Sequence, residues 1–240
     1  MQLKYVQIIS LASVFALQFF FEHIYPQKRE INNWKNEGFN LLIGLLNLAL
    51  TFIPATFFVQ WIHFIEARKL GLLHQFDLPL WINIVTSIVV LDLWMYAWHR
   101  VNHVLPFLWK FHSFHHKDTR MNSTTALRFH TVELFLSYPG KAIICLIFGI
   151  SYLPLLIYEI AFFTAVVIHH SNIYITKNAD AIYRLLFTSP HMHRIHHSKE
   201  FNETNSNFGA LFSFWDKLFN SWTMVDKEIA FGVPEVDTKE

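Results

Sequence analysis

Long apolar runs separated by short polar connections form the main pattern of this 240-residue chain. Three runs lie at about residues 5–25, 39–64 and 78–98, and a fourth, longer run lies at 134–168. A helix needs about 20 residues to cross the hydrocarbon layer of a membrane, and each of the first three runs has that length. The pattern therefore predicts that the chain crosses a membrane several times.

The fourth run is too long for one crossing and is interrupted near its middle. Gly149 and Pro154 frame the segment between its two halves, and both residue types break helices. We expect two helical arms, each of marginal length for a full crossing, joined by a tight turn. The predicted fold is all-α and polytopic, with about four transmembrane helices including this helical hairpin.

Composition agrees with this prediction. Apolar residues make up 53% of the chain and charged residues only 15%, which is typical of a membrane protein. The formal net charge of +1 gives no electrostatic case for binding nucleic acid. We interpret residues 1–240 as a single membrane-embedded domain, with N-terminal membrane helices at 1–77, a histidine-rich region at 78–222 and a tail at 223–240.

The basic residues of the connections predict an orientation. Three lie within 27–37 and five within 100–128, and more follow in the tail, whereas the connection at 66–77 has two. Because an excess of Lys and Arg marks the cytoplasmic side, we expect the histidine-rich connections on the cytoplasmic face and the N-terminus outside.

Histidines occur in three short runs that follow the apolar segments. Their members are three or four residues apart, so they share one face of a helix, as in other helical metal sites. Protonated histidines that crowd together repel one another, whereas a metal ion binds the neutral ring. The spacing therefore predicts metal ligands, namely His99 and His103, then His112, His115 and His116, and then His193, His196 and His197.

His130 and His170 extend this set to ten candidate ligands. One ion takes at most about six ligands, so ten predict two ions. His169 and His191 adjoin these residues, and for each of them ligation and a supporting or surface role both stay open. Imidazole suits zinc, copper, iron and nickel alike, so the spacing alone does not identify the metal.

Four polar residues are candidate catalytic or ligand-supporting groups. Asp92 lies inside the third apolar run, where a carboxylate is costly and calls for a partner, and Tyr96 follows one helical turn later. We expect Asp92 to accept a hydrogen bond from a ligating histidine, the alternative being a charge at the membrane edge. Glu133 either orients His130 or binds metal directly, unless it lies on a solvated helix face. Asn172 is a weaker candidate of the same kind.

The segments around these residues resemble the fatty acid hydroxylase and sterol desaturase superfamily of integral-membrane di-iron enzymes. Thr131 departs from the family pattern, which often has proline at that position. The resemblance covers about residues 78–222, in order, and rests on the segments Asp92–His103, Trp109–His116, Leu127–Glu133, His170–Asn172, Ser189–His197, Asn205–Gly209 and Phe214–Phe219.

The resemblance implies a four-helix membrane base under a cytosolic helical cap, in which a histidine cage holds two iron ions, with zinc as a substitute in purified material. It implies an O2-dependent enzyme that hydroxylates, or alternatively desaturates, an unactivated C–H bond of a lipid such as a sterol or fatty acyl lipid. The expected partners are the bilayer, its lipid substrate, O2 and a separate electron-donor protein, because we find no haem-binding electron domain in the sequence.

Two other functions stay open at this point. One is a non-oxidative metal protein that transports or stores zinc, and the other is a membrane scaffold with a degenerate site. Transporters place their ligands near the middle of the bilayer within broken helices, whereas these histidines follow the apolar runs. The completeness of the histidine set argues against the scaffold.

Overall fold

The computed structural model describes residues 2–29 and 33–234, and this part of the chain forms helices and no β-strand. The all-α, polytopic prediction is therefore confirmed. The two arms of the predicted hairpin are separate long helices. Five described helices are long and apolar enough to cross a membrane, namely α1 (Gln2–Ile24), α2 (Trp34–Ala67), α3 (Leu80–Val104), α5 (Thr131–Phe148) and α6 (Tyr152–His170).

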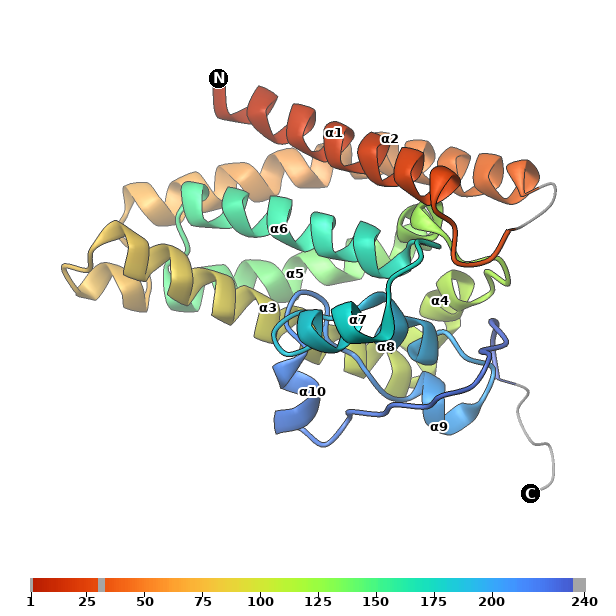
Figure 1. Ribbon diagram of the computed structural model, residues 1–240. Coiled ribbons are helices and arrows are strands. Elements are labelled where there is room, and N and C mark those ends of the chain that lie inside the picture. Colours follow the sequence, from red (N-terminus) through yellow and green to blue (C-terminus); the bar gives the residue numbers. More distant parts are fainter. Residues whose placement is uncertain (1, 30–32, 235–240) are drawn as a thin grey trace.

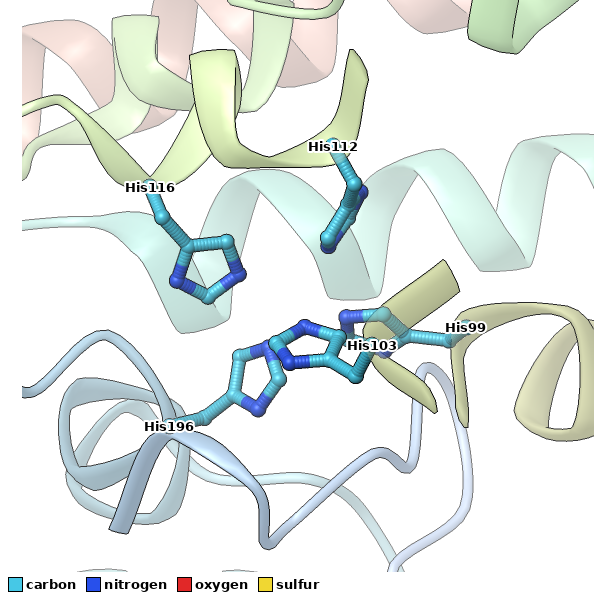
Figure 2. Close-up of side chains that lie close together, drawn as sticks. All are labelled: His99, His103, His112, His116 and His196. Carbon is cyan, nitrogen blue, oxygen red and sulfur yellow. The ribbon is translucent and has the colours of Figure 1, made fainter. Parts of the chain in front are cut away.

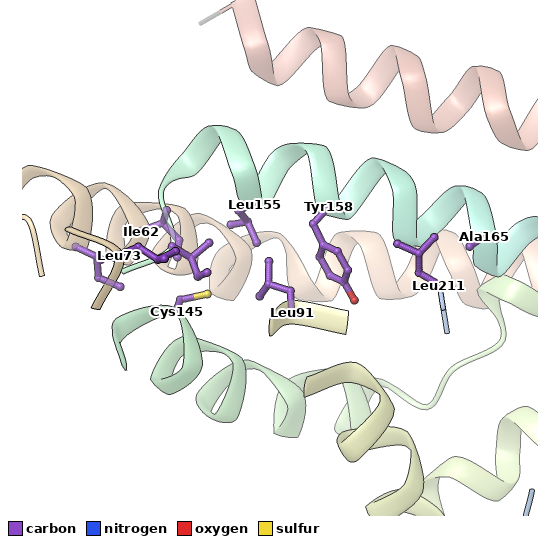
Figure 3. Close-up of a cluster of buried hydrophobic side chains, with 10 residues drawn as sticks. Ile62, Leu73, Leu91, Cys145, Leu155, Tyr158, Ala165 and Leu211 are labelled. Carbon is purple, nitrogen blue, oxygen red and sulfur yellow. The ribbon is translucent and has the colours of Figure 1, made fainter. Parts of the chain in front are cut away.

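The long helices lie side by side, with α6 packed against both α1 and α3, and α2 packed against α5 (Figure 1). Buried apolar side chains fill the space between α2, α3, α5 and α6 (Figure 3). Ile62, Leu91, Cys145 and Tyr158 supply one side chain from each of these helices and are fully buried. Cys145 is a free thiol inside this core, as its apolar surroundings predict.

The outer faces of the long helices are also apolar. Ile9 on α1 is 65% exposed, and Leu48 and Phe57 on α2 are 68% and 66% exposed. Large apolar surfaces of this kind are unfavourable in water and suit the hydrocarbon of a bilayer. Their presence on helices of spanning length supports a multi-pass membrane protein.

The hairpin turns at a glycine, as expected. Gly149 ends α5 with a φ of 73°, in the left-handed region that favours glycine. A Cβ atom at this position would lie 2.5 Å from the carbonyl oxygen of Leu70, so the connection between α2 and α3 packs directly on the turn. That connection contains the short 3-10 helix η1 (Leu72–Gln75).

Short helices form a cap at the other end of the long helices (Figure 1). The cap comprises α4 (Pro106–His116), the 3-10 helix η2 (Ser123–Leu127), α7 (Lys177–Tyr183), α8 (Pro190–His196), α9 (Phe201–Thr204) and α10 (Phe214–Leu218). All three histidine runs lie at this end, which is where α1, α3 and α6 finish and α2 and α5 begin.

Buried polar contacts hold the cap onto the helix ends. Glu22, near the end of α1, accepts hydrogen bonds from the backbone N–H groups of Ser123 and Asn172, both at 3.0 Å. The side chain of Asn40 on α2 donates to Asp118 at 2.8 Å. Because these partners are far apart in the sequence, the contacts give the cap a defined position over the membrane helices.

Candidate metal centre

Two neighbouring groups of histidines lie where the cap meets the long helices. Within each group, one ring nitrogen from every member lies within 4.8 Å of the others. The first group, whose rings converge in Figure 2, contains His99 and His103 from α3, His112 and His116 from α4, and His196 from α8. The second group contains His115 from α4, His170 at the end of α6, His193 from α8, and His197, which directly follows α8.

The short helices α4 and α8 contribute to both groups. Along α4, His112 and His116 are one turn apart and reach the first group, while His115 points to the second. Along α8, His196 reaches the first group, while His193 and His197 reach the second. The rings of His116 and His197 stack with their centroids 4.3 Å apart, so the two groups are directly adjacent.

The buried rings leave nitrogens without hydrogen-bond partners. Seven of the nine histidines are at most 2% exposed. A buried polar atom without a partner costs free energy, so a cluster of such atoms needs an explanation. The atoms concerned include Nε2 of His112, His116 and His196, Nδ1 of His193, and both ring nitrogens of His103 and His197.

The spacing of the nitrogens fits a bound ion. In the second group, Nε2 of His170 lies 3.0 Å from Nε2 of His115 and 3.0 Å from Nε2 of His193. Two nitrogen ligands at about 2.1 Å from one ion, roughly at right angles, are about 3.0 Å apart. The residues present therefore fit the two metal ions that the sequence predicts.

Backbone carbonyl groups orient several of the rings. Each of these contacts makes Nδ1 the protonated nitrogen and leaves Nε2 with a lone pair for metal, the usual arrangement around a metal ligand. The contacts join Nδ1 of His99 to Phe208 O (2.9 Å), of His196 to Ser206 O (2.7 Å), of His170 to Val166 O (2.7 Å) and of His115 to Arg128 O (3.2 Å).

The electrostatic surroundings keep the rings neutral. Burial, and then the neighbouring histidines, hold the pKa values of His115, His116, His193, His196 and His197 well below the ordinary value for histidine. The neutral imidazole is the form that binds metal, so no deprotonation is needed before an ion binds.

Glu133 supports a different histidine from the one expected. It is 5% exposed, and its Oε1 atom lies 2.8 Å from Nδ1 of His112, not beside His130. The carboxylate therefore orients a ring of the first group, while its Oε2 atom has no hydrogen-bond partner. The proximity of Glu133 to His130 in the sequence was misleading because α5 starts between them and turns the side chains apart.

Asp92 is buried but contacts no histidine among the described residues. It accepts hydrogen bonds from the backbone N–H groups of Leu211 (3.1 Å) and Phe212 (3.0 Å), and from the Trp215 indole (2.9 Å). Our expectation of an acceptor for a ligating histidine is not what the structure shows. Tyr96 likewise bonds outside the histidine groups, to the Ser221 hydroxyl at 2.7 Å.

Asp216 is a supporting residue that the sequence analysis missed. Its carboxylate accepts from the N–H groups of Phe208 (2.8 Å) and Gly209 (2.9 Å). Together with Asp92 it holds the segment 206–212, whose carbonyl groups orient His99 and His196. The available signal was an acidic residue, followed by Lys217, among the aromatic and apolar residues of the segment Phe214–Phe219.

Four other candidates lie outside the two groups. Nδ1 of His130 accepts from the Val132 N–H (3.2 Å) and so caps α5. His169 is buried with its ring 3.9 Å from that of His193. Nε2 of His191 bonds to the Val225 carbonyl (3.0 Å), and the Asn172 side chain donates to the Lys28 carbonyl (2.7 Å), joining the ends of α6 and α1.

Comparisons with known proteins agree with this geometry. A family model described as fatty acid hydroxylase matches residues 84–221, which include all nine grouped histidines. An ornithine lipid hydroxylase of Rhizobium tropici is 26% identical over 92% of this chain and 68% of its own length. An alkylglycerol monooxygenase of Caenorhabditis elegans is 29% identical over 55% of this chain and 25% of its own length.

A sphinganine C4-monooxygenase of Arabidopsis thaliana is 32% identical over 58% of this chain and 53% of its own length. No solved structure matches the chain. The chain thus spans about two thirds of the Rhizobium relative and smaller parts of the other two. Because the family model matches more than half of the chain, and the matched part carries both histidine groups, the chain belongs to the fatty acid hydroxylase family.

Proposed function

We propose that this protein is a membrane oxygenase that uses O2 and electrons from a separate donor to hydroxylate an unactivated C–H bond of a lipid. The observation that carries the proposal is the pair of adjacent buried histidine groups, with their unpartnered nitrogens, at the ends of membrane-spanning helices. In the overall reaction one oxygen atom enters the C–H bond, and the other leaves as water after the uptake of two electrons and two protons.

The nine grouped histidines would hold two iron ions, five residues around one and four around the other. Bound iron supplies the redox chemistry that O2 reduction and C–H oxidation require. The protein keeps the imidazoles neutral, orients them through carbonyl groups and Glu133, and excludes water. Such exclusion protects an oxidising site from side reactions.

Aromatic rings form apolar walls beside the histidines. Phe129 stacks on His115 with ring centroids 4.4 Å apart, and Trp109 lies 4.7 Å from His103. Apolar walls of this kind would suit the alkyl chain of a lipid. This favours a lipid substrate that keeps its head at the membrane surface.

The names of the relatives favour hydroxylation over desaturation, since each is a hydroxylase or monooxygenase. The substrates in those names share a polar head and an alkyl portion, and we extend this class to the present chain. Family membership speaks against zinc transport or storage, the alternative left open by the sequence.

The test is metal analysis combined with lipid mass spectrometry on the purified protein in nanodiscs, supplied with a reductant and 18O-labelled O2. We expect iron in stoichiometric amounts and lipid products that carry one labelled oxygen. His196→Ala should lose metal and activity, while His63→Ala, on α2 at the opposite end of the molecule, should keep both.

Two outcomes contradict the proposal. Full metal content and turnover in His196→Ala would reject the assignment of ligands. Protein that carries zinc, oxidises no lipid under these conditions and moves zinc across liposome membranes would instead support the non-oxidative alternative.

A further inference from the structure

A cavity of about 1190 Å3 lies in the cap, outside both histidine groups. Its walls come from the segments that follow α1, α4 and α6, from the stretch with α7 and α8, and from the C-terminal segment 224–231. None of the nine grouped histidines lines it. The metal centre therefore does not account for this cavity.

The cavity carries more positive than negative charge. Six basic side chains line it, and four of them form ion pairs: Lys28 with Glu228, Lys177 with Asp226, Arg184 with Asp180, and Lys227 with Glu203. The other two are Arg194 and Lys199. Among residues 2–29 and 33–234, neither has a carboxylate within ion-pair distance.

Arg194 is the more unusual of the two because it is only 9% exposed. Its Nη2 atom donates to the carbonyl oxygens of Ser171 (2.9 Å) and Ile173 (3.1 Å), and its Nη1 atom donates to Gln27. All three acceptors are neutral. Asp180 and Glu22 act on the guanidinium electrostatically, but their carboxylates bond to other groups, Asp180 to Arg184 and Glu22 to the N–H groups of Ser123 and Asn172.

The remaining donors can bind an anion. The three hydrogen bonds leave Nε of Arg194 without a partner in the described part of the chain. The Lys199 ammonium is exposed at the same cavity, and its backbone N–H bonds to Ala230 in the segment 224–231. A guanidinium and an ammonium without carboxylate partners match the charge and the several acceptor oxygens of a phosphate group.

The position of the cavity indicates where such a phosphate comes from. Gln27 and Lys28 follow the end of α1, and Asn172 and Tyr174 follow the end of α6. Both helices are of membrane-spanning length, so these wall residues lie at the level where lipid head groups meet water.

We propose that this cavity is a phosphate-binding site, separate from the metal centre, in which Arg194 and Lys199 bind the phosphate of a membrane lipid head group or of a soluble phosphate compound. The segment 224–231 covers the site through the ion pairs of Asp226 and Glu228. The proposal does not depend on the metal or on the oxidation reaction.

The test measures binding and needs no turnover. Purified protein in an uncharged detergent is analysed by native mass spectrometry with phosphatidic acid or with diacylglycerol, and separately titrated with inorganic phosphate by calorimetry. We expect phosphatidic acid to bind, diacylglycerol not to bind, and inorganic phosphate to compete. Lys199→Gln and Arg194→Gln should each weaken phosphate binding by about tenfold or more, the loss expected for one charge-assisted contact.

Lys110→Gln is the matched control, since it removes one exposed positive charge of the cap outside the cavity. Binding of inorganic phosphate that is lost in the Lys199 variant, without any preference for phosphatidic acid, would support the site and identify a soluble ligand. Equal binding of both phosphate probes by the wild type, Lys199→Gln and Lys110→Gln would overturn the proposal, even if Arg194→Gln does not fold.

Discussion

At the scale of single residues, the most informative contact of the metal centre is the one between Glu133 and His112. Both side chains are nearly excluded from solvent, with side-chain exposures of 6% and 3%. A carboxylate that accepts from the outer nitrogen of a ligating imidazole fixes the ring and raises its basicity. We therefore expect Glu133 to act on metal affinity through His112.

We predict that Glu133→Gln weakens metal binding by about 10–100-fold, the usual cost of losing such a support. Metal retention during dialysis against a graded series of chelator concentrations measures the effect. Glu66→Gln is the control and should retain metal like the wild type, because Glu66 lies at the end of α2 that is far from the histidines. Equal retention in Glu133→Gln would show that the carboxylate does not support the ligand.

At the scale of elements, the short helices α4 and α8 supply histidines to both groups. The long helices α3 and α6 place their histidines at the same end of the molecule. The seven-residue helix α8 begins at Pro190. The side chain of Ser189 caps its start by accepting from the Met192 N–H, and the C-cap His197 follows its end. His196 reaches the first histidine group, whereas His193 and His197, one turn apart, reach the second. A helix this short is marginal in isolation and depends on its packing in the cap.

The hairpin between α5 and α6 offers a test of how the long helices are held together. Gly149→Ala forces a Cβ into the left-handed region and against Leu70, so we expect a loss of about 1–3 kcal/mol in the free energy of unfolding. Gly38→Ala, on α2 with nothing within 4 Å of the added Cβ, should be neutral or slightly stabilising.

Thermal unfolding in detergent, followed by circular dichroism, compares the two glycine variants. A lowered midpoint for Gly149→Ala alone is the expected result. Equal midpoints for both variants would mean that the turn tolerates a side chain and does not restrain the hairpin.

At the scale of the whole molecule, all three histidine runs and the cap lie at one end of the long helices, and the connection at 66–77 lies at the other. This grouping matches the distribution of basic residues from which we predicted a cytoplasmic cap. The face of the membrane on which the cap lies stays a prediction, and the single native cysteine makes it testable, because Cys145 is buried.

We predict that a cysteine introduced by Lys110→Cys in the cap reacts with a membrane-impermeant maleimide only in inside-out vesicles. A cysteine introduced by Asp77→Cys in the 66–77 connection should react only in intact cells. Protein without either substitution provides the background. The reverse pattern of labelling would place the histidines on the outer face.

The apolar helices of spanning length, the hairpin turn at Gly149 and the candidate ligands could be predicted from the sequence alone, and the structure brings nine of the ten candidate ligands together. Apolar length, helix breakers and three- or four-residue spacing are local properties, so they can be derived without knowing where the helices meet. His130, the tenth candidate, instead caps a helix, because its backbone conformation is already extended at that point.

Three features became visible only in the folded chain: which histidine joins which group, the contact of Glu133 with His112, and the bond of Asp92 to the backbone of Leu211, 119 residues away. The fold also created the cavity around Arg194 from four separate parts of the chain. These features depend on the relative placement of distant helices. They cannot be predicted from the sequence because a buried polar group bonds to whichever partner the packing brings within about 3 Å.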